Sequence, residues 1–333
     1  MIITRTPFRI TLGGGGTDLP SYYERHGGFI FAAGINKYMF INVNRPIVDD
    51  LVRLKYTKSE TVEHRDGLQH ELAREALRLA GFDRAIEITS MADVPAGTGL
   101  GSSSCYVVGL LNALHTLNRQ AVGLAELAEE ACGIEIGVLR KPIGKQDQYM
   151  AAFGGLTVLE VARDGSVRVS PAQVSPTTMD DLQRNLLAFY TGSDRASTDI
   201  LAEQSRSVAT EQPAVVESLH RIKETGYRIL EALQAGDLTR FGLLLDEHWE
   251  SKKKLSARVT NHRFDEIYRL AKENGALGGK LSGAGGGGFF VFYTETGHTR
   301  LRRALQTAGL REMRYRFEFE GTKVMVNLRD GTF

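Results

Sequence analysis

The chain has 333 residues, of which 42% are hydrophobic and 24% are charged, as in ordinary globular proteins. This length allows two domains of ordinary size or one large domain. The 41 Lys and Arg residues balance 40 Asp and Glu residues, so the composition excludes the basic excess that is typical of nucleic-acid-binding proteins.

The N-terminal segment lacks the pattern of a signal peptide, and no apolar run is long enough to span a membrane. The two cysteines, Cys105 and Cys132, lie in apolar, helix-like segments without metal-ligand spacing. This placement is typical of core thiols in a reducing compartment. We therefore expect a cytoplasmic protein that binds neither membranes nor nucleic acids.

In the first half of the chain, hydrophobic alternation predicts several strands and three helices. The strands are expected at 2–12, 51–56 and 84–91, with a strand pair over 28–44. The helices are expected at about 69–81, 103–117 and 124–137. Asp164-Gly165 predicts a hairpin turn between strands at 156–161 and 167–169.

From about residue 175 the pattern changes to long amphipathic helices, which are expected to cover much of 197–256 and 262–274. The remaining expected elements are strands at 185–190, 277–281 and 288–293, a helix at 298–309, and two strands over 312–327. Strands and helices are grouped rather than regularly alternating, which predicts an α+β fold. The change of pattern predicts a domain boundary near 170–185.

The 36 glycines gather in a few blocks between hydrophobic segments, at 13–16, 97–101 and 283–288. Clustered glycine allows the backbone to approach a ligand closely, and phosphate is the usual ligand. The block at 97–101 lies between a predicted strand and a predicted helix, so its N–H groups and the helix dipole should form an anion site suited to ATP. The alternative is a helix with a flexible entry and a good N-cap. The residues expected to contact ATP are Pro95, Gly97, Gly99, Leu100, Gly101, Ser102, Ser103 and Ser104.

The two common nucleotide-binding motifs do not describe this chain. No Gly-Lys-Ser/Thr sequence occurs, which excludes a Walker A loop. The block 283–288 satisfies G-x-G-x-x-G, but the strand-like FFVFY follows it instead of a helix. We therefore expect the third block, including Gly285, to form a tight loop that crowds against a ligand.

Together, three segments resemble the signature motifs of the GHMP kinase superfamily, which includes galactokinase, homoserine kinase and mevalonate kinase. These are residues 7–18 (PFRITLGGGGTD), 95–104 (PAGTGLGSSS) and 280–290 (KLSGAGGGGFF), in the family's order. The resemblance implies a ribosomal-S5-like N-terminal domain over 1–175 and a ferredoxin-like C-terminal domain over 180–333. It also implies that ATP, with Mg²⁺, binds in the cleft between them.

Within the superfamily, residues 13–28, 145–155 and 248–256 are most similar to kinases of D-glycero-D-manno-heptose 7-phosphate. This resemblance implies phosphorylation of the anomeric hydroxyl to give the 1,7-bisphosphate, for GDP-heptose and capsule or lipopolysaccharide synthesis. Galactokinase-like members carry Gly-Glu-His-Thr-Asp where this chain has Gly14-Gly15-Gly16-Thr17-Asp18, which argues against galactose. A kinase for another sugar, such as fucose, and a regulator that binds sugar and ATP without catalysis remain as alternatives.

Two residues match the family's catalytic pair. Asp147, in GKQDQY, matches the aspartate that accepts or orients the proton of the acceptor hydroxyl. Arg9, in TPFR, matches the arginine near it, which implies that Arg9 keeps Asp147 ionised and helps to neutralise the transferring group. From the sequence alone, a structural ion pair between Arg9 and Asp18 is an alternative.

Glu135 lies 12 residues before Asp147 and matches the family's Mg²⁺-binding glutamate. Ser103, with Ser102 as the alternative, would supply the hydroxyl ligand. One carboxylate, one hydroxyl, phosphate oxygens and waters suit Mg²⁺, which gives up its water reluctantly. A solvated position on a helix face is the other interpretation of Glu135.

Asp18 resembles the aspartate that hydrogen-bonds sugar hydroxyls in related kinases, and the glycine block before it would let backbone approach the same sugar. The residues expected to bind the acceptor are Gly14, Gly15, Gly16, Thr17, Asp18, Gly285, Arg195 and Lys253. Lys253 and Arg195, with Arg258 as a further candidate, would bind the phosphate that the acceptor already carries. A solvated helix face is the alternative for the lysine run. The expected partners are ATP and a sugar phosphate, and a homodimer is left open.

Overall fold

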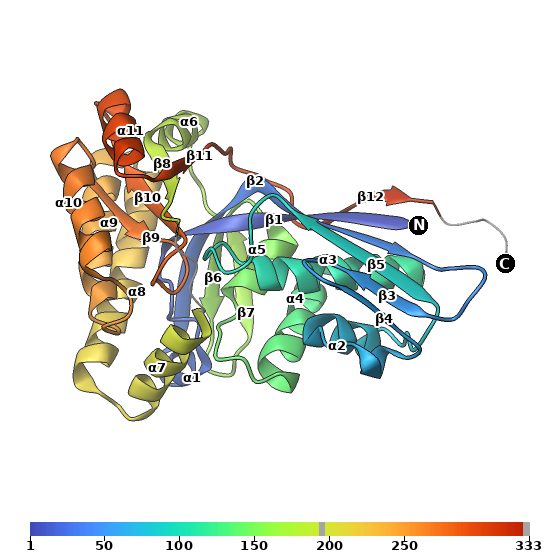
Figure 1. The fold of residues 1–333 in the computed structure, drawn as a ribbon. Helices are drawn as coiled ribbons and strands as arrows, with labels where there is room; N and C mark the ends of the chain where they lie inside the picture. Colours follow the sequence, from blue (N-terminus) through green and yellow to red (C-terminus); the bar gives the residue numbers. More distant parts are fainter. Residues whose placement is uncertain (193–196, 329–333) are drawn as a thin grey trace.

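The computed structural model describes residues 1–192 and 197–328 of the chain. They form two β-sheets, one of eight strands and one of four, with helices packed on both (Figure 1). Sheets with mostly antiparallel pairing and helices grouped apart from them confirm the predicted α+β class.

The larger sheet is built around two long antiparallel strands, β1 (Ile2–Gly13) and β2 (Gly28–Asn44). Along the edge of β2 that faces away from β1, the first half of the strand pairs with β6 and the second half pairs with β5. The main path is β12-β1-β2-β5-β3-β4, and β7 pairs with β6. The other strands of this sheet are β3 (Val52–Lys55), β4 (Ser59–Val62), β5 (Ile86–Ala92), β6 (Leu156–Val161), β7 (Val167–Pro171) and β12 (Lys323–Asn327).

Helix α3 (Ser102–Leu117) packs on β1 and β2 and is buried on nearly all sides, as its continuous apolar sequence requires. Gly109 allows this close packing, since a Cβ there would lie 2.7 Å from Thr6 Oγ1. The long strands thus hold the N-terminus of α3 in a fixed place beside β1. The other helices of this half are α1 (Pro20–His26), α2 (Glu71–Leu79), α4 (Leu124–Cys132) and α5 (Gln146–Phe153), with a 3-10 turn at Arg65–Gly67 and a π-helical turn at Gly133–Val138.

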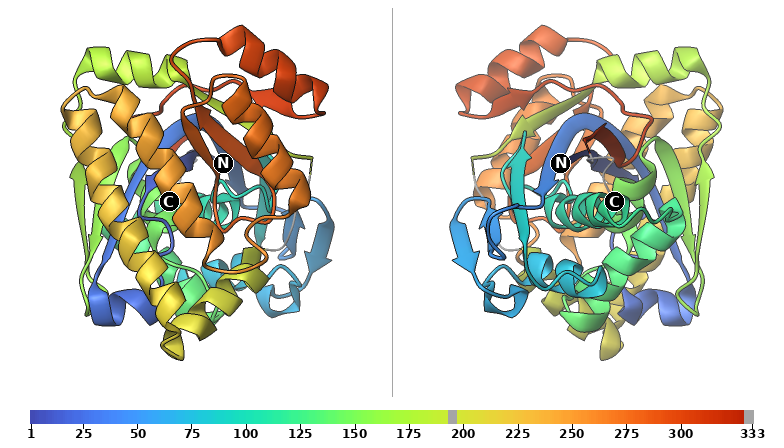
Figure 2. Two further views of the ribbon diagram at one scale, coloured as in Figure 1. Left: turned by 90° about the vertical axis from the view of Figure 1, so that its left-hand side faces the viewer. Right: turned by 90° about the vertical axis from the view of Figure 1, so that its right-hand side faces the viewer.

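The smaller sheet has the strand order β11-β8-β10-β9. In chain order this is fourth, first, third and second, which is the ferredoxin-like arrangement predicted for this half. Its strands are β8 (Leu186–Tyr190), β9 (Gly278–Leu281), β10 (Phe289–Tyr293) and β11 (Arg311–Met313). Its helices are α6 (Pro176–Asn185), α7 (Ser197–Ala209), α8 (Pro213–Gln234), α9 (Leu238–Lys253), α10 (His262–Glu273) and α11 (His298–Thr307). The left-hand view of Figure 2 shows the gold and orange helices of this half in front of the sheet.

One predicted strand pair is wrong, and another is divided between the two sheets. Residues 28–44 form one continuous strand rather than a pair, because β1 pairs with both halves of it. The two strands expected over 312–327 belong to different sheets, since β11 pairs with β8 whereas β12 pairs with β1. The last strand of the predicted range 180–333 thus completes the first sheet. The boundary near 170–185 stays a prediction.

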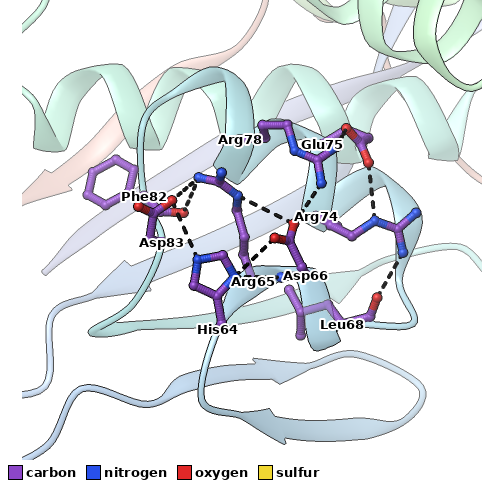
Figure 3. A network of polar contacts seen from close by, with 9 residues as sticks. All are labelled: His64, Arg65, Asp66, Leu68, Arg74, Glu75, Arg78, Phe82 and Asp83. Carbon is purple, nitrogen blue, oxygen red and sulfur yellow. Dashed lines mark hydrogen bonds and ion pairs between the residues drawn. The ribbon is translucent and has the colours of Figure 1, made fainter.

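A charged cluster attaches helix α2 to the turn that follows β4 (Figure 3). Arg78 Nη2 donates to Asp66 Oδ1 at 2.6 Å, and Arg74 Nη1 donates to the Leu68 carbonyl at 2.9 Å. The buried Glu75 accepts hydrogen bonds from both arginines. Since the acidic groups of this cluster are paired with arginines, we assign it a structural role.

Both cysteines are buried thiols without a disulfide, which confirms the prediction for Cys105 and Cys132. Burial raises the pKa of each thiol, so both stay protonated and unreactive. In the described part of the chain, no helix is both long and apolar enough to cross a membrane.

Candidate active site

The three glycine-rich segments meet at a cavity of about 570 Å³. Strand β1, the start of α3 and the loop before α5 contribute to its wall from the larger-sheet half, and α9 and the end of β9 contribute from the other half. The predicted site residues that line it are Arg9, Gly15, Gly16, Asp18, Gly97, Gly99, Gly101, Ser102, Ser103, Ser104, Glu135 and Asp147.

Arg9 and Asp147 form a close ion pair in the cavity wall. Arg9 Nε and Nη2 lie 2.7 and 2.5 Å from Asp147 Oδ1, and Arg9 Nη1 donates to the Gly99 carbonyl at 2.6 Å. Arg9 is buried, while 26% of the Asp147 side chain is exposed. Because Arg9 uses only Oδ1, the other carboxylate oxygen can accept from an incoming hydroxyl. The alternative pairing of Arg9 with Asp18 is wrong, since the ion-pair partner is Asp147.

Residues 97–101 form a tight turn that leads into α3. Gly97, Gly99 and Gly101 have φ angles of 79°, 78° and 85°, which favour glycine. A Cβ on Gly99 would lie 2.6 Å from the Ser282 carbonyl oxygen, so glycine is needed where the second and third glycine loops touch. No side chain caps α3, and Ser102 and Ser103 line the cavity at its start. The capping interpretation is therefore wrong, and the free N–H groups can bind an anion.

Glu135 is fully buried beside the first turn of α3. Ser103 Oγ donates to its Oε1, and Ser104 Oγ and Gln148 Nε2 each donate to its Oε2 at 2.7 Å. Burial raises the pKa of Glu135, and these hydrogen bonds oppose the increase. The interpretation of Glu135 as a solvated helix-face residue is therefore wrong. A buried carboxylate beside a serine hydroxyl and a phosphate-binding turn fits Mg²⁺, which needs few protein ligands.

Glu135→Gln should raise the Mg²⁺ concentration needed for half-maximal activity by about tenfold or more. The reason is that an anionic ligand becomes neutral, and a charge-assisted contact is worth about 1.5–3 kcal/mol. The measurement is the initial rate of ATP turnover as a function of Mg²⁺, with the exposed Glu126→Gln of α4 as the control. An unchanged Mg²⁺ requirement in Glu135→Gln would contradict the assignment.

Asp18 lies in the cavity wall next to the first glycine block. It is 1% exposed and accepts from the backbone N–H groups of Gln146 at 2.9 Å and Gly16 at 3.2 Å. Burial raises the pKa of Asp18 to about 6, and the nearby charge of Asp147 adds to this increase. Backbone donors thus orient a carboxylate toward a cavity in which it can accept a hydrogen bond from a sugar hydroxyl.

Several predicted acceptor-binding residues do not line the cavity but shape the loops around it. Thr17 is buried, and its hydroxyl bonds the carbonyls of Gly14 and Phe29, both at 2.8 Å. A Cβ on Gly14 would lie 1.8 Å from the Phe29 carbonyl oxygen, so packing alone requires glycine there. Gly285 packs in the same way against the backbone of Val259.

Two predicted ATP-binding residues, Pro95 and Leu100, also lie next to the cavity without lining it. Leu100 is buried, and its carbonyl accepts from the Arg9 backbone N–H at 3.3 Å. The Pro95 carbonyl accepts from the Thr98 hydroxyl at 3.0 Å. Both residues therefore support the glycine turn at 97–101, and neither lines the cavity.

Lys253 was predicted to bind the acceptor phosphate, but Lys252 is the lysine of this run that lies in the cavity wall. Lys253 does not line the cavity, and its Nζ lies 2.7 Å from Glu250 Oε1. Lys252 lines the cavity and is buried. The two lysines differ because successive residues of a helix point about 100° apart. Arg258 lies outside the lining and pairs with Glu203 at 3.5 Å, and Arg195 lies outside the described residues.

The cavity lining also contains polar residues to which the sequence assigned no individual role, among them Gln204, His248, Lys252 and Lys280. The spacing of His248 and Lys252 contained a usable signal, because residues four apart lie on one face of a helix. Gln204 comes from a distant part of the chain, and no local pattern pointed to it, whereas Lys280 is the first residue of the third glycine-rich motif, 280–290.

A helix N-terminus for phosphate, a buried carboxylate with a hydroxyl for a cation, and an arginine-held aspartate line one cavity. These are the parts that phosphoryl transfer to a small molecule requires, since that reaction depends on positioning and charge neutralisation. The fold and the site thus define a small-molecule kinase. The model of the GHMP kinases N-terminal domain matches residues 68–155, and that of the GHMP kinases C-terminal region matches residues 229–309. The chain belongs to the GHMP kinase family.

Relatives and solved structures agree with this family. A D-glycero-alpha-D-manno-heptose 7-phosphate kinase of Campylobacter jejuni is 32% identical over 97% of each chain. The crystal structure of a D-glycero-D-manno-heptose 1-phosphate kinase from Bacteroides thetaiotaomicron has a TM-score of 0.79 at 26% identity and covers 99% of this chain and 100% of its own. A putative sugar kinase from Campylobacter jejuni has a TM-score of 0.77 at 28% identity, covering 97% of both chains.

Proposed function

We propose that this protein transfers the γ-phosphoryl group of ATP to the anomeric hydroxyl of D-glycero-D-manno-heptose 7-phosphate, giving the 1,7-bisphosphate. The similarity to the Campylobacter jejuni kinase over almost the whole of both chains supports the heptose phosphate as acceptor. The observation that carries the phosphoryl-transfer step is the Arg9–Asp147 pair, held against the Gly99 carbonyl in the cavity wall.

In this proposal, Asp147 Oδ2 receives the hydrogen bond of the anomeric hydroxyl and orients its oxygen for attack. The proton then moves to the carboxylate, either before or after the oxygen attacks the γ-phosphorus. As the new phosphorus–oxygen bond forms, the bond between the γ-phosphorus and the β–γ bridging oxygen breaks, and ADP leaves. Arg9 keeps Asp147 in place through Oδ1 and puts a positive charge beside the transferring group. The N–H groups at the start of α3 hold the ATP phosphates.

Ser103 and Glu135 are the residues that would hold Mg²⁺. When bound, the ion supplies positive charge to the ATP phosphates. Asp18, oriented by the N–H groups of Gln146 and Gly16, would accept hydrogen bonds from hydroxyls of the sugar ring. The wall between Asp18 and Asp147 thus positions the sugar.

Two other functions have weaker support. The bifunctional L-fucokinase of Bacteroides fragilis is 28% identical over 94% of this chain, but the match covers 37% of that protein. A regulator that binds ATP and sugar without catalysis would not need the paired Arg9 and Asp147 or the buried Glu135. We also propose a cytoplasmic location and a role in GDP-heptose supply for capsule or lipopolysaccharide, and a homodimer stays a prediction.

The direct test is a panel of acceptors assayed for ATP-dependent product: heptose 7-phosphate, heptose 1-phosphate, unphosphorylated heptose, fucose and galactose. Heptose 7-phosphate should have a kcat/KM about a hundredfold or more above that of unphosphorylated heptose, because two charge-assisted contacts to a phosphate are worth roughly 3–6 kcal/mol. Equal use of the two would overturn the acceptor assignment while leaving the kinase family intact. If product formed only from heptose 1-phosphate, the reacting hydroxyl would have to be at the other end of the sugar.

A further inference from the structure

Three basic side chains from one region line the cavity without an acidic partner among the described residues. Lys252 and His248 lie on α9, and Lys280 lies on β9. Their exposed fractions are 6%, 0% and 3%, respectively. Burying positive charge without a carboxylate is costly unless a ligand supplies the negative charge.

The backbone satisfies only part of the hydrogen-bonding capacity of the two lysines. Lys252 Nζ donates to the carbonyls of Leu281 at 2.8 Å and Gly283 at 2.5 Å. Lys280 Nζ donates to the Leu12 carbonyl at 3.3 Å. An ammonium group carries three donors, so on these contacts one donor of Lys252 and two of Lys280 remain for a ligand.

His248 adds an unsatisfied polar group to this region. It is fully buried, and neither Nδ1 nor Nε2 has a hydrogen-bond partner in the described part of the chain. Burial, together with the charges of Lys280 and Lys252, keeps the pKa of His248 well below its usual range, so the ring is neutral. A neutral imidazole still has one N–H to donate, and buried polar groups in native proteins normally have a partner.

The pKa values of both buried lysines are lowered as well. Burial, followed by the charge of Arg9, lowers the pKa of Lys252 to about 7. Burial and the charges of Lys252 and Arg9 also lower the pKa of Lys280 well below its usual value. A bound dianion would reverse these shifts, because an opposite charge nearby favours the protonated lysine.

One contact of the cluster, that of Lys280, lies beside the glycine block that is expected to bind the acceptor. The Leu12 carbonyl, which binds Lys280, directly precedes the glycine block at 13–16. Gln204 Nε2 has no partner among the described residues and lies 2.8 Å from where a Cβ of Gly16 would be. By contrast, Glu135 and Ser103 bind each other and make no hydrogen bond or ion pair with the cluster in the described structure.

We propose that Lys252, Lys280 and His248 form the subsite for the phosphate group that the acceptor already carries. Lys252 and Lys280 supply positive charge and three free N–H donors, and His248 donates one more hydrogen bond. The identity of the acceptor rests on the proposed function, whereas the subsite requires only that the acceptor carry a phosphate at the end far from its reacting hydroxyl.

The test compares kcat/KM for heptose 7-phosphate and for unphosphorylated heptose in Lys252→Met, Lys280→Met and the double variant. Methionine keeps the length and apolar stem of the side chain but removes the charge. Each single substitution should lower the ratio of the two kcat/KM values by about tenfold or more, and the double substitution by about a hundredfold, because each removes a charge-assisted contact. The loss should appear mainly in KM for the phosphorylated acceptor.

Lys253→Met is the matched control, since Lys253 is the next residue on α9 but pairs with Glu250 outside the cavity lining. It should leave the ratio unchanged. If Lys252→Met lowers kcat/KM for both acceptors by the same factor, Lys252 acts on the transferred phosphoryl group and the proposal is wrong. An unchanged ratio in the double variant would overturn it as well.

A binding experiment keeps this inference separate from the proposed function. Inorganic phosphate, titrated calorimetrically into the whole protein, should compete with the phosphorylated acceptor and bind at least tenfold more weakly to the Lys252→Met/Lys280→Met variant. If the acceptor panel selects another sugar phosphate, the heptose assignment fails, but this loss of phosphate binding still supports the subsite. Equal phosphate binding by the wild type and the double variant would reject the subsite whatever the acceptor is.

Discussion

Replacing Asp147 with Asn is expected to lower kcat by about 10²-fold or more, the usual scale for a positioned base. Asn keeps the shape of the side chain, and its Oδ1 can still accept from Arg9 Nε and Nη2. What it loses is the negative charge and the second oxygen that would receive the proton of the acceptor hydroxyl. The affinity for ATP should change little, because the N–H groups that we propose to hold the ATP phosphates lie at the start of α3.

Steady-state kinetics with both substrates and a fluorescent ATP analogue would measure these two effects separately. Asp49→Asn is a suitable control, because Asp49 also forms an ion pair with an arginine, Arg53 at 2.6 Å, but does not line the cavity. Near-wild-type turnover by Asp147→Asn would show that the carboxylate charge is not needed. The proposed mechanism would then have to be abandoned.

Gly99→Ala is expected to cause the largest combined loss of stability and activity. A Cβ on Gly99 would lie 2.6 Å from the Ser282 carbonyl oxygen and 3.4 Å from Gly283 N, so backbone must move at the contact between two glycine loops. The Gly99 carbonyl also accepts from Arg9 Nη1 at 2.6 Å and Ser282 Oγ at 2.9 Å. Moving this loop displaces Arg9 and the phosphate-binding turn together, which should lower kcat/KM for ATP by about 10²-fold, as a misplacement of about 1 Å can do.

The matched control for Gly99→Ala is Gly81→Ala. Gly81 has φ 76°, close to the 78° of Gly99, but a Cβ there would meet nothing within 4 Å. Both substitutions carry the cost of a left-handed residue, about 1–2 kcal/mol, and only Gly99→Ala adds the clash. Urea unfolding should therefore show a larger decrease in the free energy of unfolding for Gly99→Ala, with catalysis reduced in that variant alone. Equal decreases would mean that the two loops can separate without cost.

The larger elements of the fold could be predicted because periodicity is local. The apolar segment 103–117 predicted a helix, and the five consecutive apolar residues at 289–293 predicted a strand; both elements, α3 and β10 (Phe289–Tyr293), are largely buried in the structure. The prediction of two strands over 28–44 was wrong. A single strand and a hairpin can share the same local alternation, and only continuous pairing with β1 distinguishes them.

By itself, the sequence determined the family and the α+β class and predicted many of the residues that line the cavity, because three glycine motifs and Asp147 with its flanking residues carry this information in short segments. Only the tertiary structure decided that Arg9 and Asp147, 138 positions apart, form the ion pair and that Asp18 does not take part in it. It also decided that Lys252 rather than Lys253 reaches the cavity. In a lysine run every residue has the same local chemistry, and the rotation of α9 against β9 selects the one that is buried.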